Sequence, residues 1–133
     1  SMGSGGGGSS VTWVSASSIG TTHPSFTYVQ FAKINGLLWI RGYCSYGATI
    51  PAGTTLFLLT NPSYHLDIPA TFMSPGACGE IKVFNSEYSA SKLIQLKNVP
   101  NNANKFSLHN STNFTANEYF QIQPVAMGKL LTP

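Results

Sequence analysis

Two strand-like segments flank the dipeptide Asn35-Gly36, and this arrangement constrains the fold more than any other feature of the sequence. Residues 26–34 read FTYVQFAKI and residues 37–46 read LLWIRGYCSY. Both Asn and Gly tolerate the positive φ values of a type I′ turn, so Asn-Gly between two such segments predicts a two-residue β-hairpin. Ile34 should then face Leu37, and pairing should continue outward from that position.

Both faces of the predicted hairpin carry apolar side chains. One face would hold the pairs Ile34/Leu37, Ala32/Trp39, Gln30/Arg41 and Tyr28/Tyr43, and the other Lys33/Leu38, Phe31/Ile40, Val29/Gly42 and Thr27/Cys44. Strands that are apolar on both faces are typical of sheets covered on both sides. A second sheet or a neighbouring subunit should therefore cover the outer face, and we predict a homotrimer.

The rest of the sequence predicts further short strands. The candidate strands, which are separated by turns rich in Pro, Gly and Asn, are residues 54–60, 79–85, 92–98, 105–109 and 118–125. Short strands with turn signals about every 8–12 residues are typical of a sandwich or small barrel. The expected fold class is all-β, an antiparallel β-sandwich or jelly-roll-like barrel.

Residues 1–10 differ in composition from the remainder of the chain. They read SMGSGGGGSS, which is typical of an expression scar followed by a flexible Gly/Ser linker. The folded domain is therefore expected within residues 11–133, as a single β-sandwich head. A linker at this position also predicts that the domain is the C-terminal piece of a longer protein.

Few charges are present, and this restricts the class of partner. Charged residues are 8% of the chain, about a third of the usual share. A surface of Ser, Thr, Asn and Gln suits neutral polar ligands such as sugars, contacts between copies, or simply polar loops. No two of the Lys and Arg residues are adjacent, so nucleic acid is not expected as a partner. No apolar run approaches the roughly 18 residues that span a bilayer, so membrane insertion is not expected either.

Motifs for catalysis or metal binding are missing from the sequence. The three histidines, His23, His65 and His109, lack the spacing of a metal site, and His65 forms only a single H-x-D with Asp67. The four carboxylates are scattered, and there is no G-x-S-x-G or H-E-x-x-H motif. We therefore expect no enzyme activity, no metal and no cofactor.

Several short motifs between residues 26 and 84 form a familiar series. They are the step Arg41-Gly42, the turn Pro51-Ala52-Gly53-Thr54, Tyr64 and the later strand GEIKVFN. Together they resemble the C-terminal tip domains of bacteriophage tail fibres and baseplate receptor-binding proteins. The segment Leu59-Thr60-Asn61-Pro62 departs from the Leu-Pro step of those domains.

The resemblance implies a trimeric β-sandwich or jelly-roll-like head that attaches a virion to a bacterial surface receptor, with saccharide as the leading ligand class. Such a protein is made in the host cytoplasm, where Cys44 and Cys78 should stay free and buried. The resemblance transfers no ligand-binding residues. Two other functions remain open: a structural trimerisation head without a ligand, and a carbohydrate-binding module of an enzyme.

Aromatic rings in or beside turn-rich segments, among them Tyr43 and Tyr119, are the candidates for a saccharide site, and two polar loops that carry a ring are preferred. A sugar presents an apolar C–H face and a rim of hydroxyl groups, which aromatic rings and Asn, Gln or Asp side chains complement. The first candidate loop, residues 61–67, offers Tyr64, His65 and Asp67. The second, residues 110–117, offers Asn113 and Phe114. The alternative for each ring is burial in the core or in a trimer interface.

Overall fold

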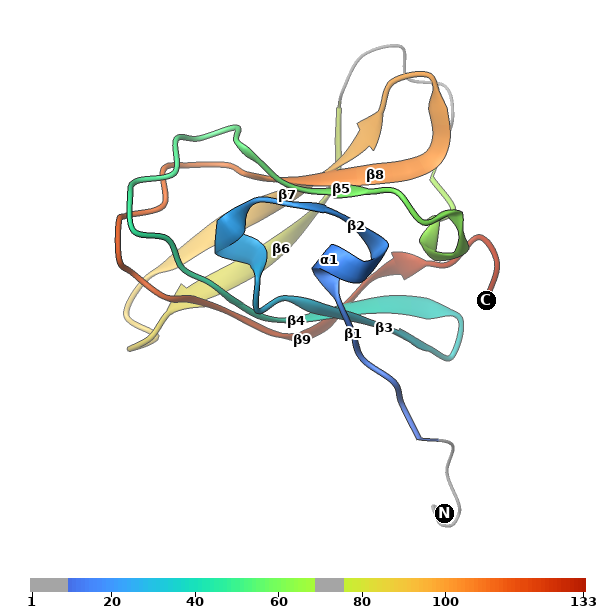
Figure 1. Ribbon diagram of the computed structural model, residues 1–133, viewed down its shortest axis with the longest axis horizontal. Helices are drawn as coiled ribbons and strands as arrows, with labels where there is room; N and C mark the ends of the chain where they lie inside the picture. Colours follow the sequence, from blue (N-terminus) through green and yellow to red (C-terminus); the bar gives the residue numbers. More distant parts are fainter. Residues whose placement is uncertain (1–9, 69–75) are drawn as a thin grey trace.

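Nine antiparallel strands form one curled sheet in the computed structural model, which describes residues 10–68 and 76–133 (Figure 1). The strands are β1 (Val14–Ser15), β2 (Gly20–Thr22), β3 (Gln30–Ile34), β4 (Leu37–Cys44), β5 (Thr55–Leu59), β6 (Ala77–Asn85), β7 (Ser91–Val99), β8 (Asn102–Asn110) and β9 (Phe120–Lys129). Their order in the sheet is β1-β3-β4-β9-β6-β7-β8-β5-β2. The all-β class is confirmed, and the sheet takes the form of a half-barrel.

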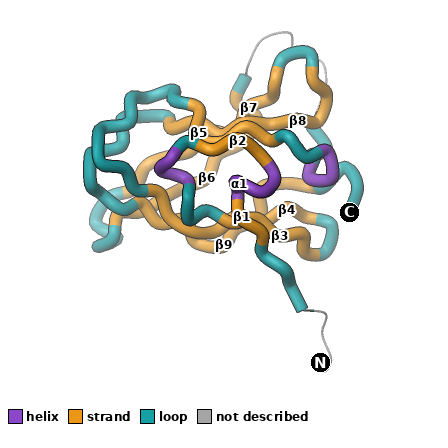
Figure 2. Tube along the Cα trace, in the orientation of Figure 1, coloured by secondary structure: helices purple, strands orange, loops and turns teal. Residues whose placement is uncertain are grey.

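The two edges of the sheet are consecutive in sequence. β1 and β2 lie at opposite ends of the strand order, yet only the short helix α1 (Ala16–Ile19) separates them along the chain. The Ala16 amide donates to the Val29 carbonyl (2.9 Å), and the Thr60 amide donates to the Ile19 carbonyl (3.0 Å). Figure 2 shows α1 between the two edge strands. We refer to residues 14–22 as the edge clasp, because they hold the two edges of the curled sheet together.

The Asn35-Gly36 hairpin is confirmed. Asn35 has φ of 51° and Gly36 has φ of 79°, as a type I′ turn requires. β3 and β4 pair in the predicted register, from Ile34 opposite Leu37 to Gln30 opposite Arg41.

Beyond Gln30 the predicted hairpin pairs do not form. The 3₁₀ helix η1 (Pro24–Phe26) ends at Phe26, the residue that was expected to start the strand. Pro24 favours the first helical position, and the His23 side chain accepts a hydrogen bond from the Ser25 amide (3.1 Å). This local cap outweighs the strand preference of the residues that follow, so β3 begins four positions later than Phe26.

The five later strands were also predicted, with some errors at their ends. β5, β6, β7, β8 and β9 each overlap one predicted segment. β8 begins at Asn102, inside the predicted turn cluster 100–104, directly after Asn101, which adopts a positive φ of 63° in the turn. A second 3₁₀ helix, η2 (Pro62–Tyr64), follows β5.

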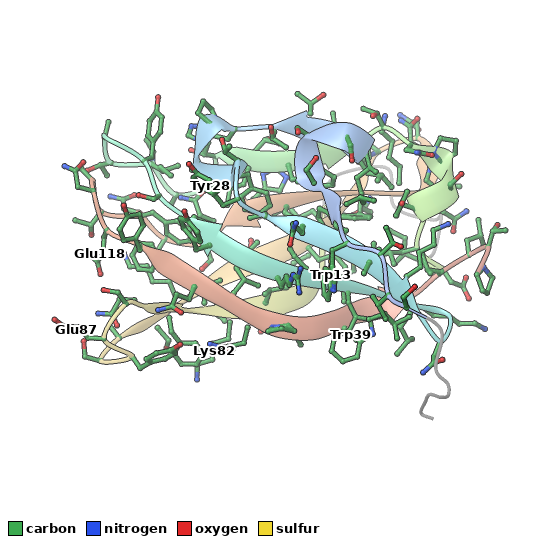
Figure 3. The ribbon with its side chains drawn as sticks, turned by 60° about the horizontal axis from the view of Figure 1, so that its bottom comes forward. Trp13, Tyr28, Trp39, Lys82, Glu87 and Glu118 are labelled. Carbon is green, nitrogen blue, oxygen red and sulfur yellow. The ribbon has the colours of Figure 1, made fainter. Side chains whose placement is uncertain are left out.

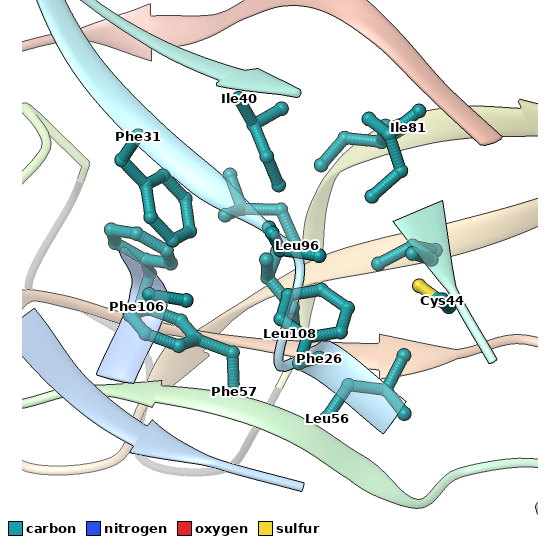
Figure 4. Close-up of a cluster of buried hydrophobic side chains, with 14 of the residues drawn as sticks. Phe26, Phe31, Ile40, Cys44, Leu56, Phe57, Ile81, Leu96, Phe106 and Leu108 are labelled. Carbon is teal, nitrogen blue, oxygen red and sulfur yellow. The ribbon is translucent and has the colours of Figure 1, made fainter. Parts of the chain in front are cut away.

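Phenylalanine rings fill the interior of the half-barrel (Figure 4). The ring of Phe57 lies 4.9 Å from that of Phe31 and 5.8 Å from that of Phe106, between centroids. From the hairpin, Phe31, Leu38 and Ile40 are fully buried. On the outer face, Trp39, Arg41 and Tyr43 are only half-buried. The predicted covering of both hairpin faces therefore holds for the inner face alone within this chain.

Both cysteines are free. Cys44 is buried, as predicted, whereas Cys78 is exposed, so the prediction of two buried thiols was wrong for the second. Cys78 lies in β6 at a break in the pairing register with β7, where its side chain does not enter the core.

Replacing Gly36 with valine is expected to lower the free energy of unfolding by about 1–2 kcal/mol. A β-branched side chain is strained at the φ of +79° that residue 36 adopts. Chemical denaturation measures the loss. Gly47→Val is the matched control, because a Cβ at Gly47 meets no atom within 4 Å and φ there lies outside the left-handed region. Equal stability of the two variants would contradict the type I′ turn.

Candidate functional site

A cavity of about 340 Å³ opens where β4, β9 and the turn after β6 meet. Its lining residues are Gly42, Tyr43, Ser86, Tyr119 and Gln121, and we call it the tyrosine pocket. Small-molecule sites commonly span about 300–1,000 Å³, so the cavity has room for a compact ligand. In Figure 3, Tyr28, Glu118 and Glu87 are labelled at this end of the molecule.

Strand alternation places the central residues of the pocket on the outer face of the sheet. Along β4, Ile40 and Cys44 are buried, whereas Arg41 and Tyr43 are half-buried. Tyr43 pairs with Gln121 of β9, and Gln121 pairs in turn with Phe84 of β6. Since paired residues project from the same face, these three side chains lie side by side across three strands.

Three tyrosine rings stand at the pocket. The rings of Tyr28 and Tyr43 are nearly parallel, with centroids 4.8 Å apart and an interplanar angle of 13°. The Tyr119 ring is perpendicular to Tyr43, at 5.5 Å and 89°. Tyr28 is 60% exposed and Tyr119 is 53% exposed, so the ring surfaces are accessible from solvent at two orientations.

Amide side chains complete the polar part of the site. The Tyr88 hydroxyl donates to Gln121 Oε1 (3.0 Å) and accepts from Gln123 Nε2 (2.8 Å). These bonds fix the two amides beside the rings. Gln121 Nε2 and Gln123 Oε1 form no hydrogen bond with the described residues, so an amide nitrogen that donates and an amide oxygen that accepts remain for a ligand.

The lining of the pocket contains no carboxylate, ammonium or guanidinium group. Burial raises the pKa of Tyr43, and the neighbouring Tyr28 and Tyr119 phenols add to this shift. The Tyr43 hydroxyl therefore stays protonated near neutral pH, where it can both donate and accept. The arrangement offers ring faces and neutral hydrogen bonds, which is the chemistry that a sugar requires.

The first predicted loop lies apart from this pocket. Tyr64 ends η2 and is half-buried, with Lys33 Nζ 4.7 Å from its ring centroid. The His65 carbonyl accepts from the Leu131 amide (2.9 Å), and the Asp67 amide donates to the Lys129 carbonyl (2.9 Å).

A second cavity, of about 300 Å³, opens beside this loop. Its lining residues are Lys33, Pro62, Ser63, Thr132 and Pro133. Tyr64, His65 and Asp67 are not among them, so the structure places the three predicted residues next to a cavity and not in its wall.

The second predicted loop is held by structural contacts. Phe114 is 1% exposed, and its ring packs 4.7 Å from that of Phe120. A ring buried in this way has no face open to a ligand, so Phe114 does not fit its predicted role. Asn113 is exposed, but its Oδ1 accepts from the Ala52 amide (2.9 Å) and so fixes the turn after Ile50.

The sequence identified Tyr43 and Tyr119 among the candidate rings, but two other loops were preferred as the site, and Tyr28 was not a candidate. Tyr28 and Tyr43 were nevertheless expected on one face of the hairpin, and Tyr119 and Gln121 are two residues apart in a predicted strand. These two patterns were the only indication in the sequence that the three rings could form one site. This indication was incomplete because nothing local in the sequence pairs β4 with β9.

The described part of the chain contains neither a metal-binding cluster nor a membrane-spanning helix. Within residues 10–68 and 76–133, no three His, Cys, Asp or Glu side chains are grouped so that they could hold a metal ion. In the same part of the chain, no helix has the length and apolar character needed to cross a membrane. No protein-family model, curated protein sequence or solved structure matches the chain.

Proposed function

We propose that this domain binds a cell-surface saccharide through the tyrosine pocket, as an attachment domain of the phage fibre or baseplate type that its sequence resembles. The observation that carries the proposal is the pair of perpendicular rings, Tyr43 and Tyr119, beside Gln121 in a cavity of about 340 Å³. In this role the domain binds the saccharide and does not catalyse a reaction.

The chemistry of the pocket supports a neutral carbohydrate. A pyranose ring can stack its C–H face on one tyrosine while its hydroxyl groups reach the phenol and amide groups of the others. Each such contact is weak. The predicted homotrimer belongs to the same proposal, because three linked sites raise the overall strength of attachment through effective concentration.

Replacing Tyr43 with alanine should weaken saccharide binding on the order of tenfold or more, because the central ring of the pocket is lost. The probes are three neutral series, oligomers of N-acetylglucosamine, glucose and galactose, titrated by calorimetry. The melting temperature should change little, since Tyr43 lies on the outer face of the sheet.

Tyr64→Ala is the matched control, because it removes a tyrosine from the rival loop. We expect it to bind every probe like the parent protein. Loss of binding in Tyr64→Ala with full binding in Tyr43→Ala would move the site to residues 61–67 and overturn the proposal. A stable trimer that binds none of the three series would instead favour the structural trimerisation head, and a stable monomer in light scattering would contradict the trimer.

A further inference from the structure

The outer face of the sheet continues away from the tyrosine pocket with a regular series of side chains. Trp39, Arg41 and Tyr43 occupy alternate positions of β4 and are all half-buried. At about 3.3 Å per strand residue, Trp39 lies roughly 13 Å from Tyr43. The row of half-buried side chains on the outer face of β4 therefore extends well beyond the tyrosine pocket.

A second aromatic platform lies along this line. The Arg41 guanidinium carbon is 4.0 Å from the centroid of the Trp13 ring, and Arg41 Nε donates to Gln30 Oε1 (2.9 Å). The ring and the hydrogen bond together hold the guanidinium group in place. Figure 3 shows Trp13 and Trp39 displaced from Tyr28 along the length of the molecule. We call the surface of Trp13, Gln30, Trp39 and Arg41 the tryptophan platform.

Polar groups separate the two sets of rings. Gln30 and Arg41 are the members of the tryptophan platform nearest to Tyr43 along β3 and β4, and the exposed Gln123 lies in β9, which pairs with the other edge of β4. The sequence predicted that a second sheet or a neighbouring subunit covers this face, but the core of a permanent interface between subunits is more apolar than this and contains fewer such groups. Rings interspersed with amide and guanidinium donors match a chain of sugars, in which apolar faces and hydroxyl groups repeat along the polymer.

We propose that the tyrosine pocket is one end of an extended site, and that the ligand is a linear oligosaccharide whose further rings lie along β4 and over the tryptophan platform. This inference rests on the proposed function. It adds the ligand's length and direction, and it assigns Trp13 and Arg41 as ligand contacts.

The test compares short and long members of each probe series, from disaccharide to hexasaccharide, in the full chain. Affinity of the parent protein should rise with length in the series that binds. Trp13→Ala should weaken the hexasaccharide on the order of tenfold and leave the disaccharide unchanged, whereas Tyr43→Ala should weaken both. Trp13→Phe keeps a ring at this position and should restore part of the hexasaccharide affinity.

Other results would overturn the inference. If Trp13→Ala leaves every length unchanged, the site ends at the tyrosine pocket and the proposed function stands alone. If Trp13→Ala weakens all lengths equally with an unchanged melting temperature, Trp13 does not contact the distal sugar units and the extended site is wrong. If Trp13→Ala lowers the molar mass in light scattering, the tryptophan platform is a contact between copies of the chain. If no series binds the parent protein, both the inference and the proposed function are wrong.

Discussion

Replacing Gly42 with alanine should lower the free energy of unfolding by about 3 kcal/mol or more. Gly42 has φ of +130°, and a Cβ there would lie 2.2 Å from the Tyr28 carbonyl oxygen and 2.9 Å from Val29 Cα. The backbone conformation alone costs a side chain about 1–2 kcal/mol. Displacing packed backbone adds about 1–3 kcal/mol. Chemical denaturation at neutral pH measures the sum.

The same substitution should also impair the tyrosine pocket. The backbone of Tyr28 must move away from β4 to admit the methyl group, and this separates the Tyr28 and Tyr43 rings, which now lie 4.8 Å apart. Gly47→Ala is the control, since a Cβ there meets no atom within 4 Å. A Gly42→Ala variant with the stability of Gly47→Ala would show that β4 approaches residues 28–29 less closely than described.

The second large effect is expected at Asn110, which is 1% exposed. Its Nδ2 donates to the carbonyls of Ile50 (3.0 Å), Pro51 (2.9 Å) and Thr112 (2.9 Å), and its Oδ1 accepts from the Thr54 amide (3.0 Å). One side chain thus holds two loops together. Asn110→Ala should lower the free energy of unfolding by about 3 kcal/mol, because each buried polar group left unpaired costs about 1–3 kcal/mol and some of these groups regain water.

Two further variants test whether the loss of stability comes from the hydrogen bonds of the Asn110 side chain. Asn110→Asp keeps the shape but replaces the donor nitrogen by an oxygen that faces three carbonyls, so it should destabilise at least as much as alanine at neutral pH. Asn113→Ala removes one exposed hydrogen bond to Ala52 and should cost less than about 1 kcal/mol. If all three variants unfold alike, the loops depend on something other than the Asn110 side chain.

The hairpin was predictable because its information is local. Asn35 and Gly36 specify the turn, and the turn specifies the register of every pair from Ile34 back to Gln30. The start of β3 was not predictable to the same degree, because it depends on a side-chain cap. Strand propensities alone do not reveal that the Ser25 amide donates a hydrogen bond to His23 Nδ1.

The candidate site was harder to predict because it depends on distant pairing. Tyr43 and Gln121 become neighbours only when β4 pairs with β9, and no short motif specifies that pairing. Phe114 shows the opposite difficulty. Its polar sequence neighbours suggested an exposed loop, yet the ring is buried against Phe120. The sequence could not distinguish these two cases, because a loop residue that packs into the core and a loop residue that contacts a ligand have similar neighbours in sequence.

The edge clasp also determines how the domain responds to mechanical load. β1 contributes two residues and β2 three, and they cover the pairing edges of the longer strands β3 and β5. Pulling the chain at residue 10 stresses the two β1 pairs, Val14 with Phe31 and Ser15 with Gln30, before any other part of the sheet. Once the clasp detaches, the free amides and carbonyls of β3 and β5 can pair with strands of another molecule. Because Ala16 and Ile19 of the clasp belong to the buried core, tension on this end of the chain would expose the edges of β3 and β5 and also uncover part of the core.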